Sequence, residues 1–449
     1  MNREPVLRVP WGLGERLRAL LHPEPFQERF AFAVARPLRT ERGAPPAAMV
    51  EQLLTLEPKD YDHTSAGGLR LTDAASARLN RWAVQVAHQG WLPVHLHSHP
   101  SGVDRFSITD DEAESRLSHW LAQHGVPSYW SLVWPTGGVP RVRLWTRGKT
   151  RPGRLFLGLA PMMAGPFQDG SQALDRQRAF GPGLRAAADQ ILVGVLGVGG
   201  LGMLVVEQLA RAGFRRFVLV DPDTVEETNL NRLPGVTRSD LGRLKVRVAK
   251  RLIRQAVVSL DLVPEICGLP HDVYRSSAAQ HALARCDLIL AVTDNDLSRT
   301  LALQLALDHG REYLQAGTDI TLDKDGAIIG LRAEVTGAEI GRYCPICSGR
   351  LSPGQASIEA RTYAGGEVAA RALSDGYVPD VAAPAVMSLN AVTAGLLVTE
   401  IQRRTAGLGV RDLLQVDLHS GATLTRERLS LGTDCQVCGA VGDAPAVAA

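Results

Sequence analysis

The chain has 449 residues, too many for one ordinary hydrophobic core, so we expect two or three domains. Hydrophobic residues make up 45% and charged residues 21%, as in soluble globular proteins, and the net charge of +2 excludes a global attraction to nucleic acid or anionic membrane. No signal-peptide pattern opens the sequence. The longest apolar stretch, 381–401, contains Pro384 and Glu400, which favours a buried helix over a membrane span. We therefore expect a cytoplasmic protein.

Residues 1–148 form the first predicted unit, in which helical and strand patterns are mixed. Helices are predicted over 14–23 and 74–89. Strands are predicted over 29–38, 49–58, 91–100, 129–135 and 140–146. This order of elements predicts an α+β domain.

Residues 149–170 are rich in Gly and Pro and weakly periodic, which predicts a linker. Strand and helix patterns alternate within 171–440, and this predicts a parallel sheet in a doubly wound α/β fold. The strands are expected at 191–200, 216–223 and 287–295, and the helices at 203–214 and 241–256. The tail, 441–449, is predicted to be disordered.

Three histidines, a serine and several carboxylates lie within residues 95–112. His97 and His99 share one face of an extended segment, and Asp110 follows. These three side chains can bind zinc and leave one position for water, which is typical of a catalytic site. Zinc would lower the pKa of that water to about 7 and polarise a carbonyl group. A polar loop without metal is the alternative.

A glycine loop joins a predicted strand to a predicted helix. Gly197, Gly199, Gly200 and Gly202 give the pattern G-x-G-G-x-G, which lets the backbone approach a phosphate at a helix N-terminus. Asp221 ends the next strand, where a carboxylate can hold ribose hydroxyls. The loop alone fits an NAD-dependent oxidoreductase as well as an ATP-using enzyme, and a simple tight turn is the structural alternative.

Two cations and a later turn favour ATP. Arg232 and Lys245 can neutralise charge that develops on a triphosphate, more than a dinucleotide needs. Asp294, in the turn Thr293-Asp294-Asn295, ends a later strand and can bind Mg²⁺. A solvated surface pair is the alternative for the two cations.

Four of the six cysteines form two C-x-x-C pairs. The pairs are Cys344 with Cys347 and Cys435 with Cys438. Four thiolates suit a closed, structural zinc site that ties distant segments together, and four reduced core cysteines are the alternative. Cys267 and Cys286 are interpreted as buried apolar residues.

The order of the glycine loop and its following motifs resembles the ubiquitin-activating-enzyme superfamily, including the ThiF and MoeB adenylyltransferases, over about 171–438. The resemblance implies adenylation of the C-terminal carboxylate of a small β-grasp protein by ATP and Mg²⁺. It also implies a zinc-tied crossover region and a homodimer. The implied ATP ligands are Gly197, Gly199, Gly200, Gly202, Asp221, Asn229, Arg232, Lys245, Asp294 and Asn295, with Arg176 reaching the ATP of the other subunit.

Many members of that superfamily carry a further cysteine after the first C-x-x-C pair, but this chain has none between 347 and 435. The chain therefore either stops at the acyl-adenylate or transfers the acyl group to a hydroxyl. Ser374 is the candidate hydroxyl, although hydroxyls are poor nucleophiles without a base.

The pattern H-S-H-P, followed by S-x-x-D, resembles the JAMM (JAB/MPN) metalloprotease signature. Those enzymes cut the amide bond after a ubiquitin-like C-terminus. The resemblance implies that His97, His99 and Asp110 bind zinc and that Ser107 stabilises the oxyanion. Glu28, just before an apolar strand, is the implied general base, with Glu24 the weaker candidate and His95 interpreted as structural.

Together the two halves predict a two-activity enzyme of a bacterial ubiquitin-like conjugation system, with one catalytic and one structural zinc. Its partners would be a ubiquitin-like β-grasp protein and, as a further candidate, a conjugating enzyme. The peptidase would either mature a precursor or remove a conjugate. The alternatives are sulfur-carrier activation for thiamine, molybdopterin or cysteine synthesis, a non-catalytic scaffold, and an NAD oxidoreductase.

Overall fold

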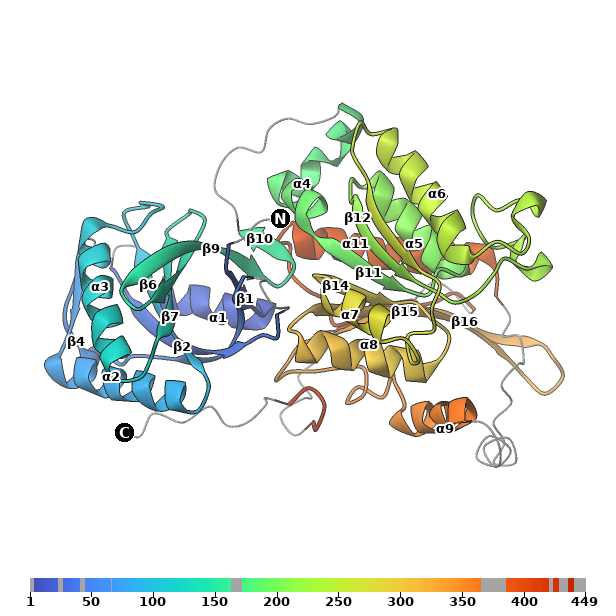
Figure 1. Cartoon of the computed structure of the whole chain (residues 1–449). Coiled ribbons are helices and arrows are strands. Elements are labelled where there is room, and N and C mark those ends of the chain that lie inside the picture. The colour runs from blue at the N-terminus through green and yellow to red at the C-terminus, as the bar shows by residue number, and fades with distance from the viewer. Residues whose placement is uncertain are drawn as a thin grey trace. The chain divides into compact units, whose positions relative to one another are not determined.

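A computed structural model of the chain divides it into two compact units, residues 1–166 with 440–449, and residues 167–439 (Figure 1). The structure describes residues 4–22, 27–40, 45–65, 67–162, 172–364, 385–419, 423–427 and 435–439. Within these ranges, no helix is both long enough and apolar enough to cross a membrane. The tail predicted to be disordered, 441–449, lies outside the described residues.

The first unit is built on a sheet that closes on itself, because β1 pairs with both β3 and β9. Its strands are β1 (Val6–Val9), β2 (Phe30–Pro37), β3 (Ala47–Leu54), β6 (Leu92–His99), β7 (Ser128–Pro135), β8 (Arg141–Thr146), β9 (Lys149–Leu157) and β10 (Ala160–Met162). The helices are α1 (Trp11–Leu21), α2 (Asp73–His88) and α3 (Ile108–Gln123), and a short hairpin consists of β4 (Tyr61–Ser65) and β5 (Gly68–Leu71).

Alternation along the strands produces the core of this unit. In β2, Ala31, Ala33 and Ala35 point inward and are fully buried or nearly so. Leu17 of α1 and Trp130 of β7 fill the same cluster. Burying each large side chain stabilises the unit by about 1.5–3 kcal/mol. The second half of β6 is also buried, which fixes the backbone that carries the histidines.

Two parts of this unit differ from the sequence prediction. The linker predicted over 149–170 is wrong for its first part, because 149–157 and 160–162 are strands of the sheet and β9 pairs with β8 and β1. Helix α3 was not predicted, because its sequence is mostly polar and its buried residues are few. A usable signal was present, since Ser107 and Asp110 form a capping box at its start.

The second unit is a doubly wound α/β domain, as the sequence predicts. Its sheet has the order β13-β12-β11-β14-β15-β16-β17-β18, and the first five of these strands are parallel. The strands are β11 (Leu192–Leu196), β12 (Arg216–Val220), β13 (Glu265–Leu269), β14 (Leu288–Ala291), β15 (Glu312–Leu322), β16 (Ile328–Ala338), β17 (Leu413–Asp417) and β18 (Thr423–Glu427).

Helices cover both faces of this sheet (Figure 1). The described α-helices are α4 (Gly181–Gln190), α5 (Gly200–Arg211), α6 (Lys245–Val258), α7 (Ser277–Ala284), α8 (Asp296–Asp308), α9 (Pro353–Ala364) and α11 (Met387–Thr405). α5, α6 and α11 lie on one face, and α7 and α8 on the other. α11 confirms the buried helix predicted from the apolar stretch, and its Glu400 pairs with Arg404 at 3.0 Å.

The strand order reverses between β11 and β14, and this reversal positions the site. From β11 the chain moves outward to β12 and β13, and from β14 it moves the other way to β15. Because the following segments leave in opposite directions, a crevice opens at the carboxyl ends of β11 and β14. The glycine loop follows β11, and the turn containing Asp294 follows β14.

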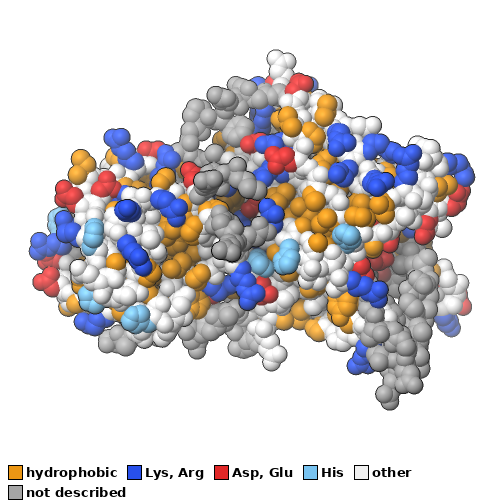
Figure 2. All heavy atoms as spheres, in the orientation of Figure 1, with side chains coloured by type: hydrophobic (Ala, Val, Ile, Leu, Met, Phe, Trp, Pro, Cys, Tyr) orange, Lys and Arg blue, Asp and Glu red, His pale blue; other side chains and the backbone are white. Residues whose placement is uncertain are grey.

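Lys and Arg side chains gather over α6 (Figure 2), so the near-zero net charge hides a local basic surface.

Cys286 is buried, as predicted, and lies close to Gly194 of β11. The prediction that Cys267 is buried is wrong, because β13 is an edge strand and leaves that thiol exposed.

Candidate functional sites

The glycine loop is held by contacts that leave no room for a side chain at Gly197 or at Gly202. Gly197 has φ +92° and donates its N–H to the carbonyl of Val220 at 2.9 Å. A Cβ on Gly202 would lie 2.1 Å from the carbonyl oxygen of Gly197. Helix α5 therefore starts directly against the loop. Its N-cap, Gly199, makes no side-chain cap, so the first-turn N–H groups are available to an anion.

Asp221 fixes the other side of the loop. It is 5% exposed, and its Oδ2 accepts the N–H of Val198 at 2.7 Å while its Oδ1 accepts the N–H of Asp223 at 2.9 Å. Burial raises the pKa of Asp221, although the Val198 N–H and the charge of Lys245 oppose this effect. The carboxylate thus orders the loop, and its predicted contact with ribose stays a prediction.

The two predicted cations lie near this loop, and each has a separate partner. Lys245, the first residue of α6, places its Nζ 2.7 Å from Asp223 Oδ2. Arg232 donates from Nη1 to the carbonyl of Thr228 at 2.6 Å, and its Cδ would lie 3.5 Å from a Cβ on Gly200. Arg232 therefore lies against the start of α5, whereas the charge of Lys245 is paired with that of Asp223.

Two of the predicted ATP ligands, Asn229 and Asn295, hold local turns of the backbone, and a third, Asp294, is exposed. Asn229 is buried and accepts the N–H of Glu226 at 3.2 Å, which closes the 3₁₀ turn Glu227–Asn229. Asn295 is the N-cap of α8 and accepts the N–H of Ser298 at 2.8 Å. Asp294, between β14 and α8, is exposed.

Sequence reasoning missed Arg299, which holds this turn from α8. Its Nε and Nη2 donate to the carbonyl of Thr293 at 2.9 and 2.6 Å. The bidentate contact fixes the backbone directly before Asp294. Arg299 lies in the first turn of α8 and reaches back six residues to Thr293, a contact that residue type and spacing alone do not indicate.

A sequence model of the ThiF family matches residues 174–436, which is more than half of the chain. The chain belongs to the ThiF family. It is 39% identical over 85 residues to a NEDD8-activating enzyme E1 catalytic subunit of Arabidopsis thaliana, covering 19% of each chain. It is 34% identical over 119 residues to the adenylyltransferase and sulfurtransferase UBA4 of Eremothecium gossypii, covering 26% of this chain and 25% of that one.

The chain thus spans a quarter or less of the length of these two curated relatives. Among solved structures, it is similar to E. coli MccB with ATP, at 16% identity and a TM-score of 0.46, covering 61% of this chain and 75% of that one.

Two ThiF-family predictions are not tested by the described contacts. Arg176 is exposed on the 3₁₀ helix Gln172–Phe180, and its contact with a second subunit stays a prediction. Ser374 lies outside the described residues.

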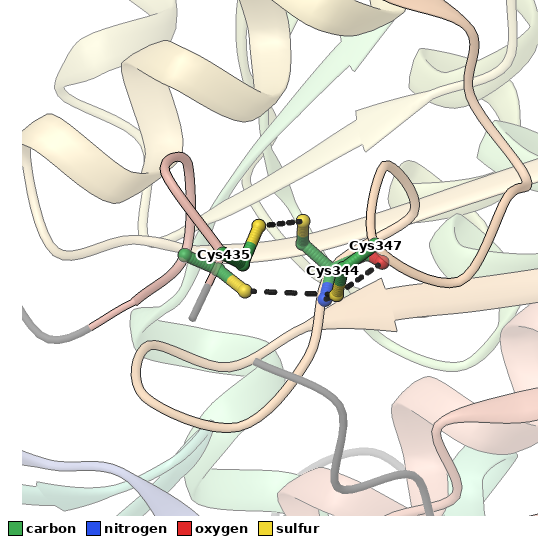
Figure 3. Close-up of side chains that lie close together, drawn as sticks. Cys344, Cys347 and Cys435 are labelled. Carbon is green, nitrogen blue, oxygen red and sulfur yellow. Dashed lines mark hydrogen bonds between the residues drawn. The ribbon is translucent and has the colours of Figure 1, made fainter. Parts of the chain in front are cut away.

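The ThiF-family unit brings its two C-x-x-C pairs together (Figure 3). Cys344 Sγ lies 3.9 Å from Cys435 Sγ, and Cys347 Sγ lies 3.8 Å from Cys438 Sγ. All four sulfur atoms lie within 4.8 Å of one another. A hydrogen bond from Cys438 lowers the pKa of the Cys344 thiol, which favours the thiolate form that metals bind. The donor set fits a zinc ion.

The first unit, outside the ThiF match, brings together the three predicted ligands of the second metal. His97 Nε2 and His99 Nε2 lie 3.2 Å apart, and each lies 3.3 Å from an oxygen of Asp110. The two histidines are 3% and 5% exposed. Two imidazole nitrogens and a carboxylate at one point form a donor set that fits zinc.

Neighbouring groups orient these ligands. The carbonyl of Val103 lies 3.0 Å from His99 Nδ1, which directs His99 Nε2 to the cluster. Ser107 donates its N–H and its hydroxyl to Asp110 Oδ2, both at 2.7 Å. Burial would raise the pKa of Asp110, but hydrogen bonds from His97 and His99 hold it well below its usual range. Ser107 thus orients Asp110, and its oxyanion role stays a prediction.

Glu28 lies beside the cluster, two residues before the start of β2. It is half-buried, and burial raises its pKa while the nearby His97 and His99 lower it. The β4–β5 hairpin holds its backbone, because Glu28 donates its N–H to Ser65 at 2.9 Å and Thr64 Oγ1 donates to the Glu28 carbonyl at 2.7 Å. The weaker candidate, Glu24, lies outside the described residues.

His95 stays apart from the cluster, as the structural interpretation expects. Its ring stacks on Phe32 with centroids 5.2 Å apart and packs against Phe30. Burial lowers the pKa of His95 to about 3, so the ring is neutral.

We predict that Gly202→Ala lowers the free energy of unfolding by about 1–3 kcal/mol, because the new Cβ cannot fit against Gly197. Gly199→Ala is the matched control, since a Cβ there meets nothing within 4 Å. Urea unfolding of both variants checks the prediction. Equal stabilities would contradict it.

We expect the purified protein to contain two zinc ions per chain. Cys344→Ser should remove one of them and lower stability, and His97→Ala should remove the other. Cys286→Ser is the control, because that buried thiol belongs to neither cluster. Metal analysis of the variants provides the measurement, and unchanged zinc in Cys344→Ser would exclude the structural site.

Proposed function

We propose that the ThiF-family unit activates a carboxylate by adenylation, with ATP and Mg²⁺. One observation carries the proposal. The glycine loop, Asp221 and both cations meet at the strand-order reversal, inside the region that matches the ThiF family. Positioning and charge neutralisation are what displacement at a phosphate requires.

Each part of the crevice has a role in this reaction. The N–H groups at the start of α5 bind phosphate oxygens, and Arg232 and Lys245 neutralise charge as pyrophosphate leaves. Lys245 would exchange its present partner, Asp223, for a phosphate. Asp294 would hold Mg²⁺, which shields the phosphates, and Arg299 keeps the backbone before Asp294 in place.

The proposed substrate is the C-terminus of a ubiquitin-like β-grasp protein. The NEDD8-activating relative supports this class, and the relative named adenylyltransferase and sulfurtransferase supports the alternative of a sulfur carrier. Arg176 would complete the ATP site of a homodimer. A conjugating enzyme is a further proposed partner, because no cysteine lies between 347 and 435 to accept the acyl group. Ser374 is the proposed acceptor within the chain.

We also propose that the first unit is a JAMM-type zinc peptidase that cuts after the same C-terminus. The convergence of His97, His99 and Asp110 beside Glu28 supports this activity. A zinc ion held by the three ligands would supply a Lewis acid for the scissile carbonyl. Glu28 would take the proton from water and pass it to the leaving amine, and burial keeps its pKa above that of an exposed glutamate.

The two alternative functions, an NAD oxidoreductase and a non-catalytic scaffold, have less support. An NAD oxidoreductase would not need Arg232 and Lys245 at the loop, and the ThiF match favours a carboxylate-activating enzyme. A scaffold without catalysis would not need the ligands of both sites to converge.

We expect ATP–pyrophosphate exchange that depends on a β-grasp carrier ending in Gly-Gly. Asp294→Ala should abolish the exchange, because the metal-binding carboxylate is lost. Asp325→Ala, an exposed aspartate at the tip of the β15–β16 hairpin, should retain it. Bound ATP without exchange, for any carrier, would contradict the proposed adenylation.

For the peptidase, we predict that Glu28→Gln reduces cleavage of a carrier with a C-terminal extension by about 100-fold or more, because the proton acceptor is lost. The zinc content should be unchanged. Glu112→Gln, an exposed residue of α3, is the matched control. Full cleavage by Glu28→Gln would assign the base to another residue.

A further inference from the structure

Asn390 is a buried amide directed at the start of α5. It is the fourth residue of α11 and is 4% exposed. A Cβ placed on Gly200 would lie 2.7 Å from Asn390 Nδ2, so the amide nitrogen lies against the glycine loop. Thr318 Oγ1, on β15, donates to Asn390 Oδ1 at 3.4 Å. This bond holds the oxygen end of the amide and leaves the nitrogen end for the loop.

Asn390 Nδ2 makes no hydrogen bond to another residue that the structure describes. The groups near it at the start of α5 include the first-turn N–H groups of α5 and the side chain of Arg232, together with one acceptor, the backbone carbonyl of Arg232, which lies 3.4 Å from the same Cβ position. An amide N–H group without an acceptor in the described protein can donate to a ligand oxygen at this point. The surroundings therefore call for an anion with several oxygen atoms.

The loop also has room on one side. A Cβ on Gly199 would meet nothing within 4 Å, whereas Gly197, Gly200 and Gly202 are all closely packed. The open side adjoins the N-terminus of α5, where backbone N–H groups favour a phosphate. Donors from α5, from Arg232 and from Asn390 of α11 thus lie around the first turn of α5.

We propose that Asn390 is a nucleotide-binding residue, whose Nδ2 donates a hydrogen bond to a phosphate oxygen of bound ATP. The proposal rests on the ATP site proposed above and adds a contact from α11. Thr318 is the positioning residue, because its hydroxyl selects the orientation of the amide. A neutral donor suits this position, since the cation Arg232 already lies beside the start of α5.

The test compares ATP with adenosine, by calorimetric titration of the full chain with a non-hydrolysable ATP analogue and with adenosine alone. Asn390→Asp replaces the donor by a negative charge of the same shape. It should weaken binding of the ATP analogue by about tenfold or more and leave the adenosine Kd unchanged. Asn390→Ala removes the whole amide, including the oxygen that accepts from Thr318, and adds no charge. It should weaken binding of the ATP analogue by about tenfold.

Ser388→Asp is the matched control. Ser388 lies in the same turn of α11, is exposed, and lies two residues away, on roughly the opposite side of the helix. It adds the same charge to the same helix end, so both Kd values should stay as in the wild type.

Two results would overturn the proposal. If ATP analogue and adenosine lose affinity equally in Asn390→Ala, the amide has only a structural role. If the ATP analogue binds both Asn390 variants normally, no phosphate contact exists. A wild-type chain that binds no ATP would overturn both this inference and the proposed adenylation. A chain whose ATP affinity depends on Asn390, but which shows no pyrophosphate exchange, would contradict the adenylation alone.

Discussion

The close approach of α5 to the backbone of the glycine loop is the constraint on which the ThiF-family site depends. Gly202 lies so near the Gly197 carbonyl that no side chain fits between them. This contact sets the position of the first turn of α5, and so the direction of its free N–H groups. Asp221 reinforces it by accepting the Val198 N–H. The cations and the turn after β14 can contribute to nucleotide binding only because this backbone is already in place.

Most of this unit could be predicted from sequence, because its signals are local. Apolar strands, a glycine loop and an amphipathic helix follow one another within short distances, and each has a distinct periodicity. The pairing of the two C-x-x-C motifs was predicted from residue type and spacing. Asn390 could not be predicted, because its contact with Thr318 depends on how α11 packs against β15 after the whole chain has folded. The contact of Arg299 with Thr293 is local, but no residue pattern assigns that side chain to a backbone carbonyl.

In the first unit, the site residues were easier to predict from the sequence than the helix and strands that hold them. The ligands His97, His99 and Asp110 were identified from a short motif, yet helix α3, which presents Asp110, was not predicted because its sequence is mostly polar. The strand β9 was mistaken for a linker, because Gly and Pro interrupt its apolar alternation. It is recruited to the sheet by β1 and β8, and such long-range pairing leaves little trace in a local pattern.

Asp110 serves two structures at once. One oxygen receives both hydrogen bonds of Ser107 at the start of α3, and the same carboxylate faces His97 and His99. Helix formation and cation binding are therefore thermodynamically linked, since each requires the carboxylate in the same orientation. A cation bound there would lower the free energy of the first turn of α3, and fraying of that turn would weaken cation affinity by the same amount.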